Sequence, residues 1–156
     1  MSTNKFNLFL ENARFLSDKF DIVPLLYGSL GLECLTGDAL GADDIDILVP
    51  RVFITDRWHE FKTLLEAQGY VLLYVHEHTF ARDGVAYSYA DIEDLESFAG
   101  INTEDIELHE TDGVRFLLLS LEQYLAVYKQ SSKDGYRVNV RQKKDADKIR
   151  FIESKL

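Results

Sequence analysis

The sequence predicts a single α+β domain over residues 1–156, in which helices flank a mixed central β-sheet and a helical segment ends the chain. Hydrophobic residues make up 46% of the 156 residues, enough to close a core in one domain of ordinary size. Near both ends of the chain, apolar residues recur at spacings of three and four, which is helical periodicity. The middle third carries short β-rich runs separated by Asp-Gly turns. This order of elements favours an α+β fold.

The first half of the chain is predicted to alternate helices with short strands. Its first helix has an apolar face formed by Phe6, Phe9, Leu10, Ala13, Leu16 and Phe20. Gly28-Ser29 separates an apolar run, Ile22–Tyr27, from a short helix over Leu30–Leu35, and a loop rich in Gly, Ala and Asp follows. Asp44–Val49 alternates acidic and aliphatic residues until Pro50, as a half-buried strand does.

A second helix and two hairpins are predicted next. The helix contains Trp58, Phe61, Leu64 and Leu65, with Gly69 just beyond its C-terminal end. Tyr70–Val75 is rich in β-forming residues, and Thr79–Asp91 forms a hairpin that turns at Asp83-Gly84. A second hairpin turns at Asp112-Gly113, between short apolar runs over Ile106–Leu108 and Val114–Leu118.

Two amphipathic helices are predicted to end the chain. Ser120 stands three residues before Gln123, the spacing of a capping box at a helix N-terminus. The last helix covers roughly Lys144–Leu156 and places Ile149, Ile152 and Leu156 on one side.

Composition excludes several classes of protein. The net charge of −10 argues against an extended nucleic-acid partner, because such binding depends largely on Lys and Arg contacts to phosphate. No apolar run approaches the roughly 18 residues of a membrane span. One cysteine, Cys34, excludes an internal disulfide framework. We therefore expect a cytoplasmic protein whose partner is a small ligand, a metal-chelated phosphate or another protein.

Two short motifs point to a specific chemistry. Residues two apart on a strand project to the same face, so Asp44 and Asp46 are predicted to project together. Two adjacent carboxylates repel each other unless a cation neutralises them, and hard divalent ions prefer such oxygen ligands. Gly28-Ser29 lies between a strand and a helix, where backbone N–H groups and the positive helix end attract an anion. Together the motifs predict phosphoryl or nucleotidyl transfer.

These motifs resemble those of the DNA polymerase β-like nucleotidyltransferase superfamily. An apolar strand ending in Gly-Ser, followed by Asp-x-Asp on the next strand, is its pattern. The superfamily includes the head domain of CCA-adding enzymes, antibiotic nucleotidyltransferases and nucleotidyltransferase-type antitoxins. Near the C-terminus, the helix after Ser120 with Lys129, and then Arg141 and Lys144-Asp145, resembles the lincosamide and antitoxin-like branches. The likeness covers residues 22–50 and 114–152.

The resemblance implies a role for individual residues. Gly28 and Ser29 match the phosphate-binding turn, with Lys144 as a further contact to the nucleotide, and Asp44 and Asp46 match the metal-binding carboxylates. A neighbouring strand normally supplies a third carboxylate, which acts as catalytic base and metal ligand. Asp91 is the favoured candidate here and Glu93 the alternative. Two Mg²⁺ ions are then expected, with a nucleoside triphosphate as substrate.

Two functions remain open on the sequence. The first is Mg²⁺-dependent transfer of a nucleoside monophosphate from the triphosphate to a hydroxyl of a small molecule or a protein. The second is a catalytically inactive protein of the same fold, acting as a binding or antitoxin-type protein. Asp43 adds a negative charge where many relatives carry Ser or Arg, which speaks against tight nucleotide binding. A carboxylate from Asp91 or Glu93 within metal reach of Asp44 and Asp46 would favour the enzyme, and a displaced one the binding protein.

Overall fold

The computed structural model describes residues 3–133 and 140–156. The chain divides into two compact units, which are described separately. Unit 1 comprises residues 1–93 and 108–118, and unit 2 comprises residues 94–107 and 119–156. The expectation of one domain over the whole chain stays a prediction.

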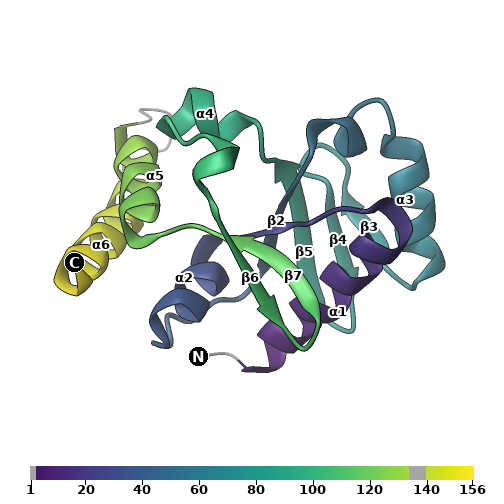
Figure 1. Ribbon diagram of the computed structural model, residues 1–156, viewed down its shortest axis with the longest axis horizontal. Coiled ribbons are helices and arrows are strands. Elements are labelled where there is room, and N and C mark those ends of the chain that lie inside the picture. The colour runs from purple at the N-terminus through teal and green to yellow at the C-terminus, as the bar shows by residue number, and fades with distance from the viewer. Residues whose placement is uncertain (1–2, 134–139) are drawn as a thin grey trace. The chain divides into compact units, whose positions relative to one another are not determined.

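A seven-stranded mixed sheet with helices confirms the predicted α+β class (Figure 1). The strand order is β3-β4-β5-β2-β1-β7-β6. The strands are β1 (Leu25–Tyr27), β2 (Ile45–Val49), β3 (Val71–Tyr74), β4 (Thr79–Arg82), β5 (Val85–Asp91), β6 (Glu107–Thr111) and β7 (Val114–Leu118). β2 lies at the centre of unit 1, antiparallel to β1 and parallel to β5.

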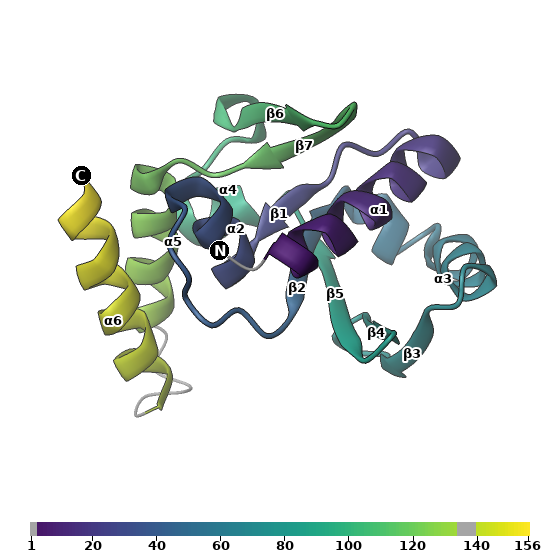
Figure 2. The ribbon, with the colours of Figure 1, turned by 90° about the horizontal axis from the view of Figure 1, so that it is seen from below.

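β1 and β2 are joined by a short helix, α2 (Gly28–Thr36), which follows β1 without a loop (Figure 2). The predicted strand at Ile22–Tyr27 is confirmed only for its last three residues. The predicted helix over Leu30–Leu35 is confirmed and begins at Gly28. Gly37 ends it in the left-handed conformation, with φ of +81° and its N–H bonded to the Glu33 carbonyl at 2.8 Å.

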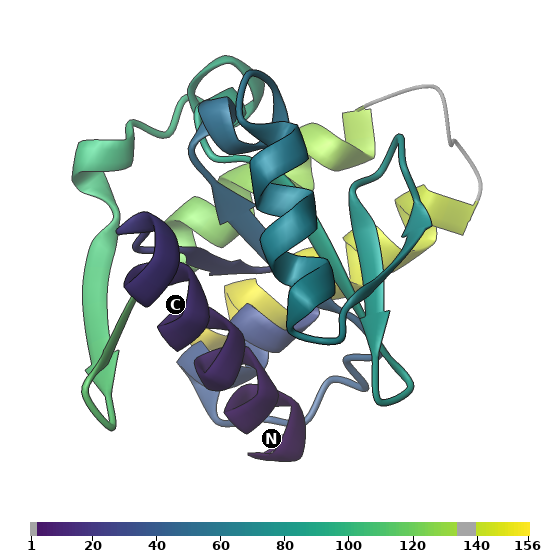
Figure 3. The ribbon, with the colours of Figure 1, turned by 90° about the vertical axis from the view of Figure 1, so that its right-hand side faces the viewer.

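Two helices cover one face of the sheet, α1 (Thr3–Phe20) and α3 (Trp58–Ala67) (Figure 3). The predicted apolar face of α1 is confirmed, since all six of its side chains are buried. They pack on the strand residues that alternate toward this face, which include Ile45, Ile47, Val49, Tyr87 and Tyr89. Burial of these side chains provides the main hydrophobic stabilisation of unit 1. The residues between them, such as Asp46, therefore face the opposite side of the sheet.

Both predicted Asp-Gly hairpins are confirmed. In each, the aspartate and the glycine have positive φ: +53° and +78° at Asp83-Gly84, and the same two values at Asp112-Gly113. Positive φ at both central residues is the geometry of a type I′ turn, which matches the twist of the flanking strands.

Unit 2 contains helices α4 (Asp94–Ala99), α5 (Leu121–Lys133) and α6 (Val140–Lys155), of which the sequence did not predict α4. The capping box before α5 is confirmed: Ser120 Oγ accepts from the Gln123 N–H at 3.1 Å, and Gln123 Oε1 accepts from the Ser120 N–H at 2.9 Å. Among the described residues, α6 begins four residues earlier than the predicted Lys144. Within residues 3–133 and 140–156, no helix has the length and hydropathy needed to cross a bilayer.

Tyr87 and Tyr89 are expected to make the fold less stable at alkaline pH. Burial raises the pKa of both hydroxyls, and the nearby Tyr70 raises them further. The unfolded chain ionises these groups near pH 10, so the folded state holds more protons above that pH. We expect the free energy of unfolding to fall above pH 10, by up to about 1.4 kcal/mol per pH unit for each group. Urea unfolding of Tyr89→Phe should show a shallower fall than the wild-type chain, and identical slopes would contradict this.

Candidate nucleotide-binding site

The junction of β1 and α2 carries the Gly28-Ser29 motif. Gly28 is the first residue of the helix, and its φ of +64° lies in the region that side chains disfavour. Tyr27 at the N-cap makes no side-chain hydrogen bond to the first turn. The positive end of the helix dipole lies at this junction, and it favours an anion.

Asp46 lies directly against this junction. The antiparallel register pairs Asp46 with Tyr27, which precedes Gly28. A Cβ placed on Gly28 would lie 2.4 Å from Asp46 Oδ2 and 3.2 Å from its Cγ. A side chain at residue 28 would have to displace the Asp46 carboxylate, so the structure brings together the predicted phosphate-binding turn and one predicted metal-binding carboxylate.

Asp44 and Asp46 stand at the start of β2. Asp44 is exposed and immediately precedes the strand, while Asp46 is half-buried within it. Asp43 is also exposed. The carboxylates of Asp44 and Asp46 supply oxygen donors, the type of ligand that hard divalent cations prefer.

Glu33 holds the loop that leads into these aspartates, and the sequence analysis did not identify it. Its side chain is 1% exposed, and Oε2 accepts the N–H of Leu40 at 2.9 Å and of Ala42 at 3.0 Å. A carboxylate that accepts two backbone N–H groups fixes the loop backbone between α2 and β2. The sequence signal for this role was a single acidic residue, Glu33, within an otherwise uncharged and largely apolar helix.

Asp91 and Glu93 have other partners. The parallel register pairs Asp91 with Val49, on the face that packs against α1 and α3 and about 10 Å along the strand from Asp46. Asp91 forms an ion pair with Arg51 and accepts the Glu93 N–H at 2.8 Å. Glu93 Oε2 accepts the Arg51 N–H at 3.0 Å. The strand register thus places Asp91 away from Asp46, and Glu93 follows the last paired residue of β5.

Ser88 occupies the position beside Asp46 on β5. The two residues are register partners, so their side chains share one face of the sheet. Ser88 Oγ is 2.8 Å from Thr79 Oγ1 of β4, the next strand. Among the described residues, no group of three or more His, Cys, Asp or Glu side chains is placed to hold a metal ion. The residue of β5 directly beside Asp46 is therefore a serine and not one of the predicted carboxylates, Asp91 or Glu93.

The C-terminal residues that were predicted to contact the nucleotide belong to unit 2. Lys144 is exposed on α6, and its part in nucleotide binding stays a prediction. The side chain of Arg141 lies outside the described residues.

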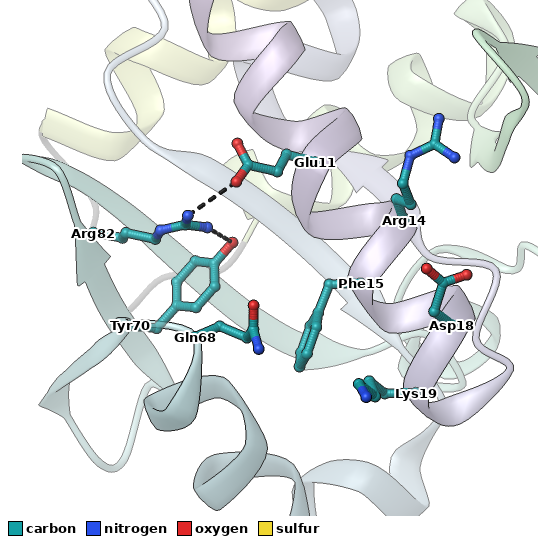
Figure 4. A pocket seen from close by; sticks show the side chains of 8 residues that line it. All are labelled: Glu11, Arg14, Phe15, Asp18, Lys19, Gln68, Tyr70 and Arg82. Carbon is teal, nitrogen blue, oxygen red and sulfur yellow. Dashed lines mark hydrogen bonds and ion pairs between the residues drawn. The ribbon is translucent and has the colours of Figure 1, made fainter.

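A pocket in unit 1 lies apart from all these residues, between α1 and the segment around Tyr70 (Figure 4). Its volume is about 280 Å³. Arg82 lines one side of the pocket, paired with Glu11 at 2.9 Å and donating to the Tyr70 hydroxyl at 3.1 Å. Because none of the predicted site residues lines it, we do not assign the nucleotide site to this pocket.

Comparison with known proteins supports the fold. No protein-family model matches the chain. The uncharacterized protein YnaI of Bacillus subtilis (strain 168) is 38% identical over 147 residues, which is 94% of each chain. The crystal structure of ANT(2″)-Ia in complex with adenylyl-2″-tobramycin superimposes with a TM-score of 0.60 and 12% identity, covering 99% of this chain and 90% of that one. A solution structure of the antibiotic-resistance factor ANT(2″)-Ia gives 0.58 and 14%, covering 99% and 91%.

ANT(2″)-Ia is an aminoglycoside nucleotidyltransferase of the DNA polymerase β-like superfamily. The chain described here has the fold of these proteins, and the resemblance seen in its motifs is thus confirmed at the level of the fold.

The contact between Gly28 and Asp46 predicts an unusually costly substitution. Gly28→Ala and Gly113→Ala both place a Cβ at positive φ, which costs about 1–2 kcal/mol of stability. A Cβ on Gly113 meets no atom within 4 Å, so this variant reports the backbone strain alone. We expect Gly28→Ala to lose more stability in urea unfolding, since it must also displace the Asp46 carboxylate. Equal losses would contradict the close approach.

Proposed function

We propose that this chain, which belongs to the same family as YnaI of Bacillus subtilis, binds a nucleoside triphosphate together with Mg²⁺ at Gly28, Ser29, Asp44 and Asp46. The observation that carries the proposal is the contact between Gly28 and the Asp46 carboxylate. A phosphate held at the helix terminus would lie beside a carboxylate that binds the metal, and a metal–triphosphate complex requires that juxtaposition. As part of this proposal we place the protein in the cytoplasm, where nucleoside triphosphates are abundant.

The phosphate end of the nucleotide is assigned to the first turn of α2. The N–H groups at this terminus and the Ser29 hydroxyl are hydrogen-bond donors, and the helix dipole favours negative charge. Without a Cβ at residue 28, phosphate oxygens can approach the backbone.

Asp44 and Asp46 are assigned to the metal. Bound Mg²⁺ would neutralise the phosphate charge and the repulsion between the two carboxylates. Glu33 contributes indirectly, because it fixes the loop that precedes Asp44.

Ser88 favours binding without turnover. A second metal ion, which activates an acceptor oxygen in two-metal transfer, needs its own carboxylate contacts. The neighbouring strand offers Ser88 beside Asp46, while Asp91 is paired with Arg51 on the other face. We therefore propose one tightly held Mg²⁺ instead of two, and a binding protein of the nucleotidyltransferase fold as the principal function.

Transfer of a nucleoside monophosphate is the second candidate, favoured by the retained Gly28-Ser29 turn and Asp44–Asp46 pair. In that reaction an acceptor hydroxyl oxygen bonds to the α-phosphorus, the bond from that phosphorus to the pyrophosphate breaks, and the hydroxyl proton passes to a base. The acceptor would be a small molecule or a protein.

Nucleotide binding is tested by removing one charge at a time. Asp44→Asn and Asp46→Asn should each weaken binding of ATP with Mg²⁺ by at least about tenfold, or 1.4 kcal/mol, in calorimetric titrations. Asp43→Asn is the matched control, an exposed neighbouring aspartate outside the proposed site, and it should retain binding. In the wild-type chain, amide NMR shifts should cluster at Gly28 and Ser29 only when metal and nucleotide are both present. Shifts elsewhere, or none, would overturn the proposal.

Substitutions of Ser88 distinguish the two candidate functions. Without metal, Ser88→Asp should lower the free energy of unfolding by about 1 kcal/mol, because its carboxylate repels that of Asp46. Mg²⁺ should restore the lost stability, and the variant should release pyrophosphate from ATP faster than the wild-type chain. Ser88→Asn, of the same shape but uncharged, should do none of these. If the wild-type chain releases pyrophosphate as fast as Ser88→Asp, transfer proceeds without the third carboxylate and the second candidate is correct.

A further inference from the structure

The two edges of the unit 1 sheet differ in the residues that they expose. β3 forms one edge, outside β4 in the strand order (Figure 2). The β3 segment has four largely exposed apolar side chains, at 49–60% exposure: Val71, Leu73, Tyr74 and Val75. Half of the eight large apolar side chains exposed among the described residues thus lie within five consecutive positions. An edge strand also presents unpaired backbone groups to a further strand.

Charge distinguishes this edge from the opposite edge of the sheet. Residues 68–76 contain no Asp, Glu, Lys or Arg, although the whole chain carries a net charge of −10. The opposite edge, β6, carries Glu107 and Glu110, and its one comparably exposed apolar residue is Leu108. Proteins protect an edge with charged residues, proline, a short strand or a bulge; β3 has no charge or proline, but it has only four residues and an irregular register. Two copies of so acidic a chain can approach closely only through an uncharged surface.

We propose that β3 pairs antiparallel with β3 of a second copy, which forms a twofold dimer and joins the two seven-stranded sheets. With the twofold axis at Leu73, Leu72 lies opposite Tyr74, and Val71 lies opposite Val75, the first residue of the turn that follows β3. Aromatic and β-branched cross-strand pairs of this kind are favourable. Glu77 falls opposite Gly69, so no like charges meet.

The irregularity of β3 favours a second copy over an unrelated strand. The register with β4 shifts between Leu72 and Tyr74, so Leu73 has no partner on β4. Such a bulge increases the local twist and disfavours pairing with a regular strand. In the twofold pairing each bulge faces its own equivalent, and the two twists match.

A charge-swap experiment tests the dimer with the full chain. Sedimentation velocity of the wild-type chain should give a species of twice the 17.9 kDa chain mass, with a concentration-dependent equilibrium. Leu73→Lys and Leu73→Glu should each be monomeric, because they place like charges across the axis, with dimerisation weakened at least about tenfold. An equimolar mixture of the two should dimerise again, which a misfolded variant would not do. Leu108→Lys, at the other edge, should remain dimeric.

Hydrogen exchange provides a readout that needs no variant. Amides in residues 71–75 of the wild-type chain should exchange more slowly at high protein concentration than at low concentration, while those of β6 should not change. A wild-type chain that is monomeric at all concentrations would overturn the proposal. So would a mass above the dimer, a Leu73→Lys variant that still dimerises, or a charge-swapped mixture that remains monomeric. Nucleotide binding at Gly28 and Asp46 is measured separately and does not affect these outcomes.

Discussion

The close approach of the β1–α2 junction to β2 is the constraint on which the candidate site depends. β1 has three residues, and α2 begins immediately after it at Gly28. The neighbouring strand therefore lies close to the turn between β1 and α2. The register places Asp46 opposite Tyr27, and its carboxylate occupies space that a Cβ on Gly28 would need. Glu33 then fixes the connecting loop from inside the helix. The glycine, the buried glutamate and the aspartate thus act as one positioning unit within about twenty residues of sequence.

Local patterns in the sequence were sufficient to predict most elements of unit 1. The apolar spacing of α1, the acid–aliphatic alternation of β2 and the two Asp-Gly turns each depend on neighbours a few residues away. The capping box at Ser120 is equally local. For the same reason, the Gly28-Ser29 and Asp44–Asp46 motifs could be identified without a structure, and the structure then places Asp46 beside Gly28. The resemblance to a known superfamily relied on these local motifs.

The position of the third carboxylate could not be predicted from such local patterns. It depends on how β5 is aligned with β2, two strands separated by about forty residues, and a change of register by one residue reverses the face of every side chain. Asp91 looked suitable because it ends a β-rich run, yet the register pairs it with Val49 and leaves Ser88 beside Asp46. Its ion pair with Arg51 ties the end of β5 to the residues after β2. An acidic residue at a strand end therefore has a structural role here that the sequence pattern does not distinguish from a catalytic one.

The strand order also has a consequence for how the chain folds during its synthesis. The segment from β1 to β2 is contiguous, so its contacts can form as soon as about fifty residues have left the ribosome. The other side of β1 is filled by β7, whose Leu117 pairs with Leu25 across more than ninety residues of sequence. Until β7 emerges, β1 is a temporary sheet edge next to the glycine turn. We expect the nascent chain to form its Gly28-Ser29 turn early and to remain prone to non-native strand pairing at β1 until β7 has left the ribosome.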